Sequence, residues 1–332
     1  MILVTGATGL VGSHLLLHLL QQEEGSVRAI YRNTQSINKT KQVFELYHAL
    51  ALFEQIQWQQ ADLLDLPALE KAFEGVTRVY HCAAMISFDP KDEHLMRKTN
   101  IEGTANIVNL CIAYQIAKLC HVSSIAALGE SLHPSTPITE KTEWNPELYH
   151  SDYALSKFGG EMEVWRGTQE GLDVIIVNPG VIFGRGFYRE GSSELLYKVH
   201  QGFPFYTSGT TAVVSVEDVV SCMIRLMRSN HKNERYILVS DNLDNRELLH
   251  FIAALLHKKP ASFEIGRFGL ALAWRLDAFI SVLTRKKRSF TRAIAKASLS
   301  RFNYDTSKVE QTLSFQFISY RDFLTELSKS FK

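Results

Sequence analysis

The stretch Thr5-Gly6-Ala7-Thr8-Gly9-Leu10-Val11-Gly12 is the strongest indication of how this chain folds. It has the spacing G-x-x-G-x-x-G, it follows an apolar run at 2–5, and a helical pattern of leucines follows it. Between a strand and a helix, such glycines permit a sharp turn, close approach of a pyrophosphate, and tight helix–strand packing. The free amides and dipole of the helix N-terminus then favour an anion. We therefore predict a loop that binds the phosphates of a nucleotide cofactor through Gly6, Thr8, Gly9, Leu10, Val11 and Gly12.

Strand and helix patterns alternate outward from this loop. Extended patterns occur at 27–31, 56–63, 78–84, 118–124 and 173–177, and helical patterns at 10–20, 40–53, from Pro67, 93–116 and 153–169. Strands that alternate with helices predict a parallel sheet covered on both faces, and right-handed crossovers make that sheet doubly wound. The predicted fold class is therefore α/β, a Rossmann-type doubly wound parallel sheet.

The alternation becomes irregular after Gly184, where Gly and Pro recur and most later patterns are helical. One more extended pattern, at 235–240, indicates that the chain returns to the sheet. We expect an NAD(P)-binding domain over 1–184, with 211–240 returning to it. A smaller, mostly helical substrate-binding part is expected over 185–210 and 241–332.

The composition excludes several classes of protein. Of the 332 residues, 45% are hydrophobic and 21% charged, as in an ordinary globular protein, and the net charge of +1 gives no global attraction to nucleic acid. The four cysteines form no C-x-x-C pair, and His14 and His18 lack a third ligand, so we predict no metal. The apolar run follows Met1 without the basic region of a signal peptide, and we expect a cytoplasmic protein.

Two C-terminal segments bear on membranes. The apolar stretch 269–284 is interrupted by Arg275 and Asp277, so it predicts an amphipathic helix and no membrane span. The basic cluster Arg285-Lys286-Lys287-Arg288 follows, with Arg292 and Lys296 beyond it. A solvated helix end is the simpler interpretation of this cluster, and contact with an anionic membrane surface or a phosphorylated substrate is the alternative.

The end of the second strand bears on the choice of cofactor. An NAD site usually has Asp or Glu there to bind the ribose hydroxyls, whereas this chain has Tyr31-Arg32-Asn33. Because Arg32 can pair with a 2′-phosphate, NADP(H) is favoured and NAD(H) remains the alternative. Asp62 and Leu63 end the third strand, where Asp62 is a candidate for the adenine edge. Ala83 and Ala84 end the fourth, where small side chains permit a close approach of the cofactor.

Tyr153 and Lys157 form a Y-x-x-x-K pair that faces one side of a predicted helix. A lysine ammonium beside a phenol lowers the pKa of tyrosine, which then serves as a general acid or base. Ser124 ends a predicted strand, where its hydroxyl can polarise a carbonyl. Alone, Y-x-x-x-K is usually a chance match on a helix surface. The order of glycine loop, serine and Y-x-x-x-K about 30 residues later makes the catalytic interpretation specific.

The chain resembles the extended short-chain dehydrogenase/reductase superfamily, the NAD-dependent epimerase/dehydratase family. The motifs that carry the resemblance occur in order over most of the chain. They are T-G-A-T-G-L-V-G at 5–12, H-C-A-A at 81–84, N-I-E-G-T-A-N at 100–106, V-S-S-I-A-A-L-G at 122–129, Y-A-L-S-K at 153–157, N-P-G-V-I-F-G at 178–184 and V-S-V-E-D-V-V at 214–220.

The resemblance implies a role for each matching residue. Tyr153 becomes the proton donor or acceptor, Lys157 binds the nicotinamide ribose and tunes Tyr153, and Ser124 orients the carbonyl. Around them the resemblance implies supporting or cofactor-contacting positions for Ser123, Asn100, Pro179, Gly180 and Val181. Members of the superfamily often form homodimers through the two helices expected here at 93–116 and 153–169.

Within the superfamily, enzymes acting on nucleotide sugars often carry Arg six residues, and Asn three residues, before the glycine equivalent to Gly184. This chain has Asn178 and Val181 at these positions. Dehydratases tend to have Asp-Glu after the serine or threonine, and here Ile125-Ala126 follow Ser124. The remaining pattern, including N-Y-D-T-S-K-V-E-Q-T-L-S-F at 303–315, resembles the dihydroflavonol-reductase-like and 3β-hydroxysteroid-dehydrogenase-like branch.

These observations predict an NAD(P)(H)-dependent oxidoreductase that interconverts a ketone and a secondary alcohol on a small, moderately apolar substrate. Two alternatives stay open: a nucleotide-sugar epimerase or dehydratase with tightly bound NAD, and a catalytically silent cofactor-binding regulatory protein. Aromatic residues that either line a substrate pocket or belong to the core are Phe88, Phe183, Phe187 and Phe205.

Overall fold

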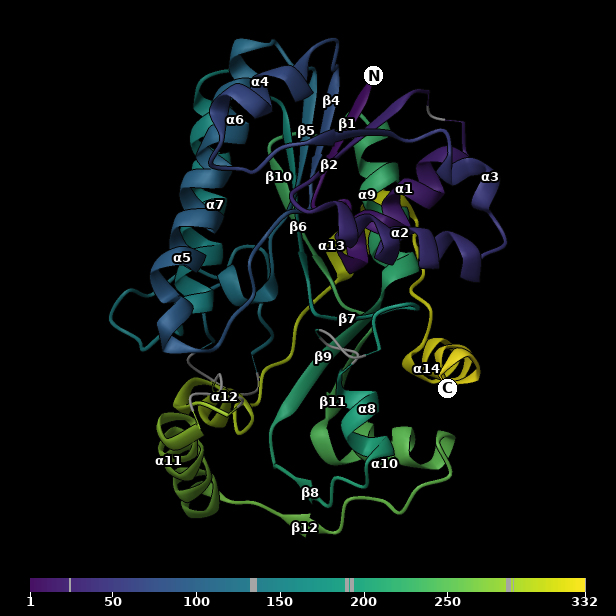
Figure 1. Ribbon diagram of the computed structural model, residues 1–332. Coiled ribbons are helices and arrows are strands. Elements are labelled where there is room, and N and C mark those ends of the chain that lie inside the picture. The colour runs from purple at the N-terminus through teal and green to yellow at the C-terminus, as the bar shows by residue number, and fades with distance from the viewer. Residues whose placement is uncertain are drawn as a thin grey trace.

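The structure, a computed structural model, describes residues 1–23, 25–131, 136–188, 191, 194–284, 288 and 290–331. At its centre lies a seven-stranded sheet of order β10-β6-β5-β4-β1-β2-β3, in which every neighbouring pair is parallel (Figure 1). The strands are β1 (Ile2–Thr5), β2 (Val27–Tyr31), β3 (Gln57–Gln60), β4 (Arg78–His81), β5 (Lys118–Val122), β6 (Val174–Pro179) and β10 (Glu234–Leu238). The predicted Rossmann-type α/β fold is confirmed. The strand order reverses between β1 and β4, where sheets of this kind bind their ligands.

Helices cover both faces of this sheet (Figure 1). One face packs against α1 (Leu10–Gln21), α2 (Thr34–Leu46), α3 (Leu50–Phe53), α9 (Val216–Arg228) and α13 (Ser307–Leu313). The other packs against α4 (Leu66–Phe73), α6 (Gly103–Ala113) and α7 (Asp152–Gln169). Because both faces are covered, the central strands are buried along most of their length, as β6 with six buried residues shows.

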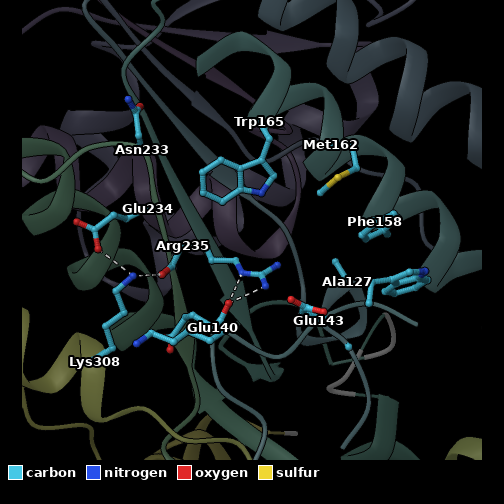
Figure 2. Close-up of a pocket in the computed structure, with 13 residues that line it drawn as sticks. Ala127, Glu140, Glu143, Phe158, Met162, Trp165, Asn233, Glu234, Arg235 and Lys308 are labelled. Atoms are coloured by element: carbon cyan, nitrogen blue, oxygen red, sulfur yellow. Dashed lines mark hydrogen bonds and ion pairs between the residues drawn. The ribbon is translucent and has the colours of Figure 1, made fainter. Parts of the chain in front are cut away.

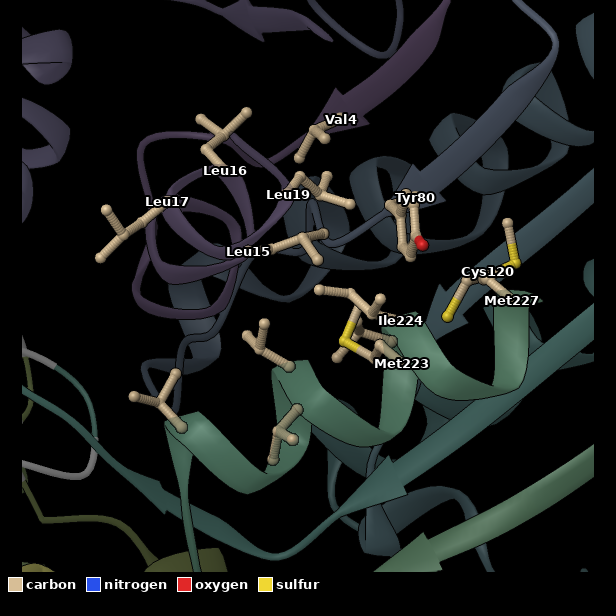
Figure 3. Packing of buried hydrophobic residues seen from close by; sticks show 14 of the residues in the cluster. Val4, Leu15, Leu16, Leu17, Leu19, Tyr80, Cys120, Met223, Ile224 and Met227 are labelled. Atoms are coloured by element: carbon tan, nitrogen blue, oxygen red, sulfur yellow. The ribbon is translucent and has the colours of Figure 1, made fainter. Parts of the chain in front are cut away.

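The packing of α1 on α9 explains the leucine pattern that follows the glycine loop. Leu15 and Leu19 are fully buried and lie opposite Met223 and Ile224 of α9 (Figure 3). The leucines recur at helical spacing, so they form one apolar face that holds the start of α1 against the end of β1. The packing of α1 on α9 therefore fixes the position of the glycine loop.

Two predicted helices differ from those observed. The pattern at 40–53 belongs to two helices, α2 and α3, because the chain turns at His48, which has a positive φ of 53°. The pattern at 93–116 is interrupted: α5 (Glu93–Arg97) is followed by a π-helical turn, Lys98–Glu102, before α6 begins. Such turns insert one residue and re-aim the side chains around them. Asn100 lies in this turn.

The remaining strands and helices form the C-terminal part below the sheet in Figure 1. A three-stranded sheet joins β7 (Val181–Phe183), β9 (Thr210–Ser215) and β11 (Asp241–Asp244), and a short parallel pair joins β8 (Phe205–Tyr206) and β12 (Phe263–Glu264). The helices are α8 (Glu194–His200), α10 (Asn245–Leu255), α11 (Arg267–Thr284), α12 (Arg292–Ala297) and α14 (Tyr320–Ser330). Among the described residues, no helix is long and apolar enough to cross a bilayer.

Candidate functional site

Of the three glycines in the loop, two are required by packing within the protein and one is not. Gly6 has a φ of +63°, and a Cβ there would lie 2.6 Å from the Ala83 nitrogen. A Cβ on Gly12 would overlap the carbonyl oxygen of Gly6. At Gly9, the residue before α1, the nearest atom to a Cβ would be Gly6 O at 3.4 Å, an ordinary contact. The protein itself therefore needs Gly6 and Gly12, while Gly9 leaves room at the helix N-terminus that fits a cofactor phosphate.

Arg32 and Asp62 lie side by side at the ends of β2 and β3. The Arg32 Nη1 to Asp62 Oδ2 distance is 3.9 Å, and the side chains are 71% and 44% exposed. Asp62 also accepts a hydrogen bond from the Leu64 amide at 2.9 Å. A long, exposed ion pair is weak, so Arg32 is free to turn toward an anion. Leu63, next in the chain, is buried against Gly103 of α6.

The three predicted catalytic residues come together where β5 ends and α7 begins. Ser124 follows β5, and its side chain forms a hydrogen bond with Tyr153 in the first turn of α7. Lys157 is one turn further, is 4% exposed, and donates from Nζ to the Val122 carbonyl at 2.8 Å. Two hydroxyls and an ammonium are thereby held at the carboxyl edge of the sheet.

Burial decides the protonation of these groups. Burial raises the pKa of Tyr153 above 10.0, and the hydrogen bond with Ser124 only partly offsets this. The expectation that Lys157 lowers the pKa of Tyr153 is therefore wrong for the protein as described, in which Lys157 is directed to a backbone carbonyl. Burial also lowers the pKa of Lys157 from 10.5 to about 8, and the nearby Glu161 carboxylate opposes that shift. At neutral pH Tyr153 is a neutral phenol that can donate its proton.

A chain of buried hydrogen bonds connects the fourth strand to the catalytic helix. His81 Nε2 lies 3.0 Å from Thr104 Oγ1, which donates to the Asn100 carbonyl at 2.7 Å. The Asn100 amide donates to Ser156 Oγ at 2.9 Å, and Ser156 donates to the Tyr153 carbonyl at 2.8 Å. Burial lowers the pKa of His81 to about 3, so it stays neutral in this chain.

Asn100 also fixes the segment that follows β4. Its side chain accepts from the Met85 amide at 2.7 Å and donates to the Met85 carbonyl at 2.9 Å. Gly160 permits this arrangement, because a Cβ there would lie 2.6 Å from the Asn100 carbonyl oxygen. Ala83 and Ala84 lie in the segment so held. The Asn100 side chain is thus fully engaged within the protein and positions its neighbours.

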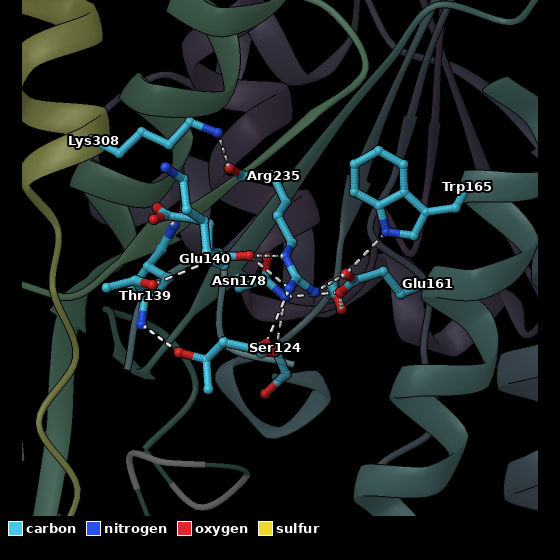
Figure 4. A network of polar contacts seen from close by, with 12 residues as sticks. Ser124, Thr139, Glu140, Glu161, Trp165, Asn178, Arg235 and Lys308 are labelled. Atoms are coloured by element: carbon cyan, nitrogen blue, oxygen red, sulfur yellow. Dashed lines mark hydrogen bonds and ion pairs between the residues drawn. The ribbon is translucent and has the colours of Figure 1, made fainter. Parts of the chain in front are cut away.

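A buried carboxylate that the sequence analysis did not select organises the other side of the site (Figure 4). Glu161 is fully buried and accepts from Ser123 Oγ at 2.6 Å and from the Asn178 amide at 2.8 Å through Oε2. Its Oε1 accepts from Arg235 Nη1 at 3.0 Å and from Trp165 Nε1 at 3.3 Å. Its spacing was the available signal, since Glu161 lies one turn after Lys157 on the same helix.

This network reaches the catalytic serine through the backbone. Asn178 donates to the Ser124 carbonyl at 3.0 Å as well as to Glu161, so one amide joins β6, α7 and the end of β5. Arg235, from β10, donates to the Glu140 carbonyl at 2.6 Å. Asn178 therefore has a structural role in this chain, at the position where the resemblance implies that enzymes acting on nucleotide sugars often carry Arg.

A pocket of about 590 Å³ lies on the outer side of the same network (Figure 2). Its lining includes Trp165, Met162 and Phe158 of α7, and Arg235 and Lys308 from the C-terminal half. It does not include Ser124, Tyr153 or Lys157. The pocket is therefore separate from the residues that carry the chemistry, and Arg235, which lines it, pairs with Glu161 of the network.

The four predicted substrate residues lie in different surroundings. Phe88 is 43% exposed, and its ring centroid lies 5.9 Å from that of Tyr153. Phe183 is 1% exposed and stacks on Phe323, and Phe187 is 7% exposed in the core that includes residues of α1 and α9. Phe205 is 37% exposed, in β8 of the C-terminal part. The structure therefore brings Phe88 next to the catalytic tyrosine and places Phe183 and Phe187 in cores.

The segment after β6 runs close to the C-terminal part. Gly180 donates to the Leu238 carbonyl at 3.0 Å, and a Cβ on it would lie 2.6 Å from the Ala212 carbonyl oxygen. Pro179 ends β6 and Val181 begins β7, so the chain crosses from the large sheet to the small one at this point. Of the predicted basic cluster, Arg285, Lys286 and Lys287 lie outside the described residues. The described portion of the chain holds no group of three side chains suited to a metal ion.

Comparisons with known proteins find similarity over most of the chain. The model of the "NAD dependent epimerase/dehydratase family" matches residues 2–238 of the chain. Sterol demethylase protein B of Methylococcus capsulatus (strain Bath) is 28% identical over 310 residues, which cover 92% of this chain and 87% of that protein. A putative dihydroflavonol 4-reductase of Synechocystis is 25% identical over 97% of this chain and 92% of that protein.

Among solved structures, that of gox2253 has a TM-score of 0.82 with 25% sequence identity, and the match covers 100% of this chain and 97% of that chain. The similarity therefore extends beyond the nucleotide-binding sheet to the C-terminal part.

Proposed function

Since the chain belongs to the NAD-dependent epimerase/dehydratase family, we propose that it interconverts a ketone and a secondary alcohol on a small, moderately apolar substrate. One observation carries the proposal: the hydrogen-bonded pair of Ser124 and Tyr153 lies beside the exposed ring of Phe88. Two hydroxyls on one side of an apolar surface fit a carbonyl oxygen that must be oriented and protonated. The relatives named as a dihydroflavonol reductase and a sterol demethylase protein are consistent with such a substrate.

The chain's own residues supply every step except hydride transfer, which the nicotinamide supplies when bound. Ser124 donates a hydrogen bond to the substrate oxygen and fixes its position. Tyr153, neutral at pH 7 because burial raises its pKa, gives its proton to that oxygen as negative charge develops there. Lys157, one turn after Tyr153 on α7, would hold the ribose of the nicotinamide through its ammonium group when the cofactor is bound.

We favour NADP(H) over NAD(H) as the cofactor. The Arg32 side chain is 71% exposed and lies 3.9 Å from the Asp62 carboxylate, so a 2′-phosphate can displace that pairing. Thermal unfolding of wild type and Arg32→Ala, each with NADPH and with NADH, tests this choice. A larger shift with NADPH that disappears in the variant supports it, and equal shifts in both proteins would refute it.

A nucleotide-sugar epimerase or dehydratase is the second candidate, because the family includes such enzymes by its name. It predicts NAD that remains bound through purification and stabilisation by a nucleoside diphosphate sugar. The apolar Ile125 and Ala126 after Ser124 supply no further acid or base for dehydration, which favours the reductase. A catalytically silent regulator would bind cofactor and show no turnover with any ketone or alcohol.

We also infer a cytoplasmic homodimer that associates through α5, α6 and α7. Leu95, Tyr114 and Met162, on or directly after these helices, are exposed, and an interface there would bury them. Sedimentation of wild type and Met162→Glu tests the association. A lower sedimentation coefficient for the variant supports a dimer at this face, and identical values would argue against it.

A further inference from the structure

Helix α11 carries its apolar face outward. Phe268, Leu272, Leu276, Phe279 and Leu283 recur at spacings of three or four residues, and they are 94%, 60%, 50%, 69% and 76% exposed. Residues with this spacing share one face of a helix, and in a globular protein that face normally turns to the core. A contiguous exposed apolar surface of this kind marks an interaction site. Figure 1 shows α11 at the periphery of the C-terminal part.

Polar contacts hold the other side of α11 against the protein, so its orientation is fixed. Asp277 faces inward and pairs with Arg288 at 3.5 Å, and each side chain is 18% exposed. The Arg288 guanidinium also donates to the Trp274 carbonyl at 3.1 Å, and its backbone amide donates to Asp89 at 3.1 Å. A helix that buries its carboxylate and exposes its phenylalanines is oriented for an apolar partner.

Charge selects the kind of partner. The segment 261–301 contains nine Lys or Arg and two Asp or Glu, a net charge of +7, whereas the whole chain has +1 and the rest therefore −6. Six of the nine cations lie in the described residues, and the exposed ones include Arg267, Arg275, Arg292 and Lys296. An apolar face flanked by cations fits the surface of an anionic bilayer. A second copy of the chain would bring two segments of +7 together, so self-association through α11 is disfavoured.

Arg288, four residues after α11, connects this helix to the segment beside the catalytic tyrosine. Asp89, which Arg288 binds, directly follows Phe88, and the Phe88 ring lies 5.9 Å from that of Tyr153. In α12, which follows α11 in the chain, Lys296 lies 4.7 Å from the ring centroid of Tyr149, four residues before Tyr153. The inner side of α11 is therefore connected through Arg288 and Asp89 to Phe88, beside Tyr153.

We infer that α11 docks in the interface of an anionic lipid bilayer, lying on the membrane without crossing it. Docked in this way, the protein takes a substrate that partitions into lipid, an apolar alcohol or ketone, from the membrane beside Phe88. The statement about the substrate rests on the proposed function, whereas the docking of α11 does not.

The test uses the full chain and vesicles of phosphatidylcholine, alone or mixed with phosphatidylserine. Wild type floats with the mixed vesicles and less with phosphatidylcholine alone. Leu276→Glu/Phe279→Glu lowers the bound fraction at least about tenfold, since two large apolar side chains no longer enter the lipid. The matched control is Leu50→Glu/Leu66→Glu, which changes two leucines that are 40% and 45% exposed in α3 and α4. It binds vesicles as wild type does, and circular dichroism checks that both variants are folded.

Equal binding by wild type and the α11 variant, or no binding of wild type to either vesicle, would overturn the docking. So would a wild-type dimer in lipid-free buffer that the α11 variant dissociates, since a second copy would then cover this face. Reduction of a water-soluble ketone by wild type without vesicles tests the proposed function separately. If that reaction is absent while vesicle binding persists, the proposed function fails and the docking stands. Wild type should also reduce a ketosterol embedded in vesicles faster than the α11 variant does, and equal rates would refute delivery from the membrane.

Discussion

Replacement of Glu161 by leucine tests whether the buried polar network holds the catalytic serine in place. Ser123, Asn178, Trp165 and Arg235 all donate hydrogen bonds to this fully buried carboxylate. Removal of the carboxylate leaves the Arg235 guanidinium, itself only 18% exposed, without its charge partner. Asn178 keeps its bond to the Ser124 carbonyl but loses the second contact that fixes its amide.

The expected cost follows from the burial of both charges. Breaking a buried ion pair by removing one partner typically costs about 3–5 kcal/mol, because the remaining charge is left unpaired. At roughly 2 °C per kcal/mol for a chain of this size, Glu161→Leu should lower Tm by about 6–10 °C. Replacing both partners, as in Glu161→Leu/Arg235→Met, removes the unpaired charge and should cost less than Glu161→Leu alone.

The assay is reversible urea unfolding of wild type, both single variants and the double variant, combined as a double-mutant cycle. A positive coupling between Glu161 and Arg235, with kcat reduced in Glu161→Leu, is the expected result. Additive effects, or a cost below about 1 kcal/mol for Glu161→Leu, would refute the reasoning, because the network would then contribute no more than a surface pair.

Three further predictions concern the cofactor and the pH profile. Gly12→Ala should destabilise the fold, because its Cβ overlaps the Gly6 carbonyl, whereas Gly9→Ala should leave Tm nearly unchanged and weaken cofactor binding. Calorimetry measures the Tm of each variant and a titration measures its cofactor affinity. Equal losses of Tm in the two variants would contradict the assignment. Arg32→Ala should weaken binding of NADPH more than of NADH, as measured by titration, and an equal loss for both would leave Arg32 without a role in selectivity. Lys157 is cationic below its pKa of about 8, so the rate of reduction should fall as pH rises through about 8. Glu161→Gln should move this fall in rate to lower pH, because the variant lacks the carboxylate that raises the pKa of Lys157. A fall in rate at the same pH in the variant would mean that another group titrates.

Much of the fold was accessible from the sequence because its signals are local. The glycine loop needs one short stretch of chain, and the alternation of apolar strands with amphipathic helices needs windows of about ten residues. The π-turn at Lys98–Glu102 was not accessible from a local window, and it lies where Gly160 of a distant helix comes close to Asn100. Tertiary contact, absent from any local window, decides such details.

The candidate site, like the fold, could be predicted from the sequence only where the signal is local. Ser124, Tyr153 and Lys157 were identified by order and spacing, and the structure brings them together. The pKa of Tyr153 could not be predicted from the spacing of Tyr153 and Lys157, because it depends on burial by residues far away in the chain. Phe183 illustrates the remaining ambiguity, since an aromatic residue near a site has the same letter whether it faces a substrate or stacks in a core on Phe323.

The most direct test of the central claim follows the hydride itself. NADPH carrying deuterium at the transferable position is incubated with the protein and an apolar ketone, and the product alcohol is analysed by mass spectrometry. The account predicts one deuterium at the carbinol carbon with wild type and almost none with Tyr153→Phe. Absence of label from every ketone, together with conversion of a nucleoside diphosphate sugar by protein that retains its NAD, would contradict it.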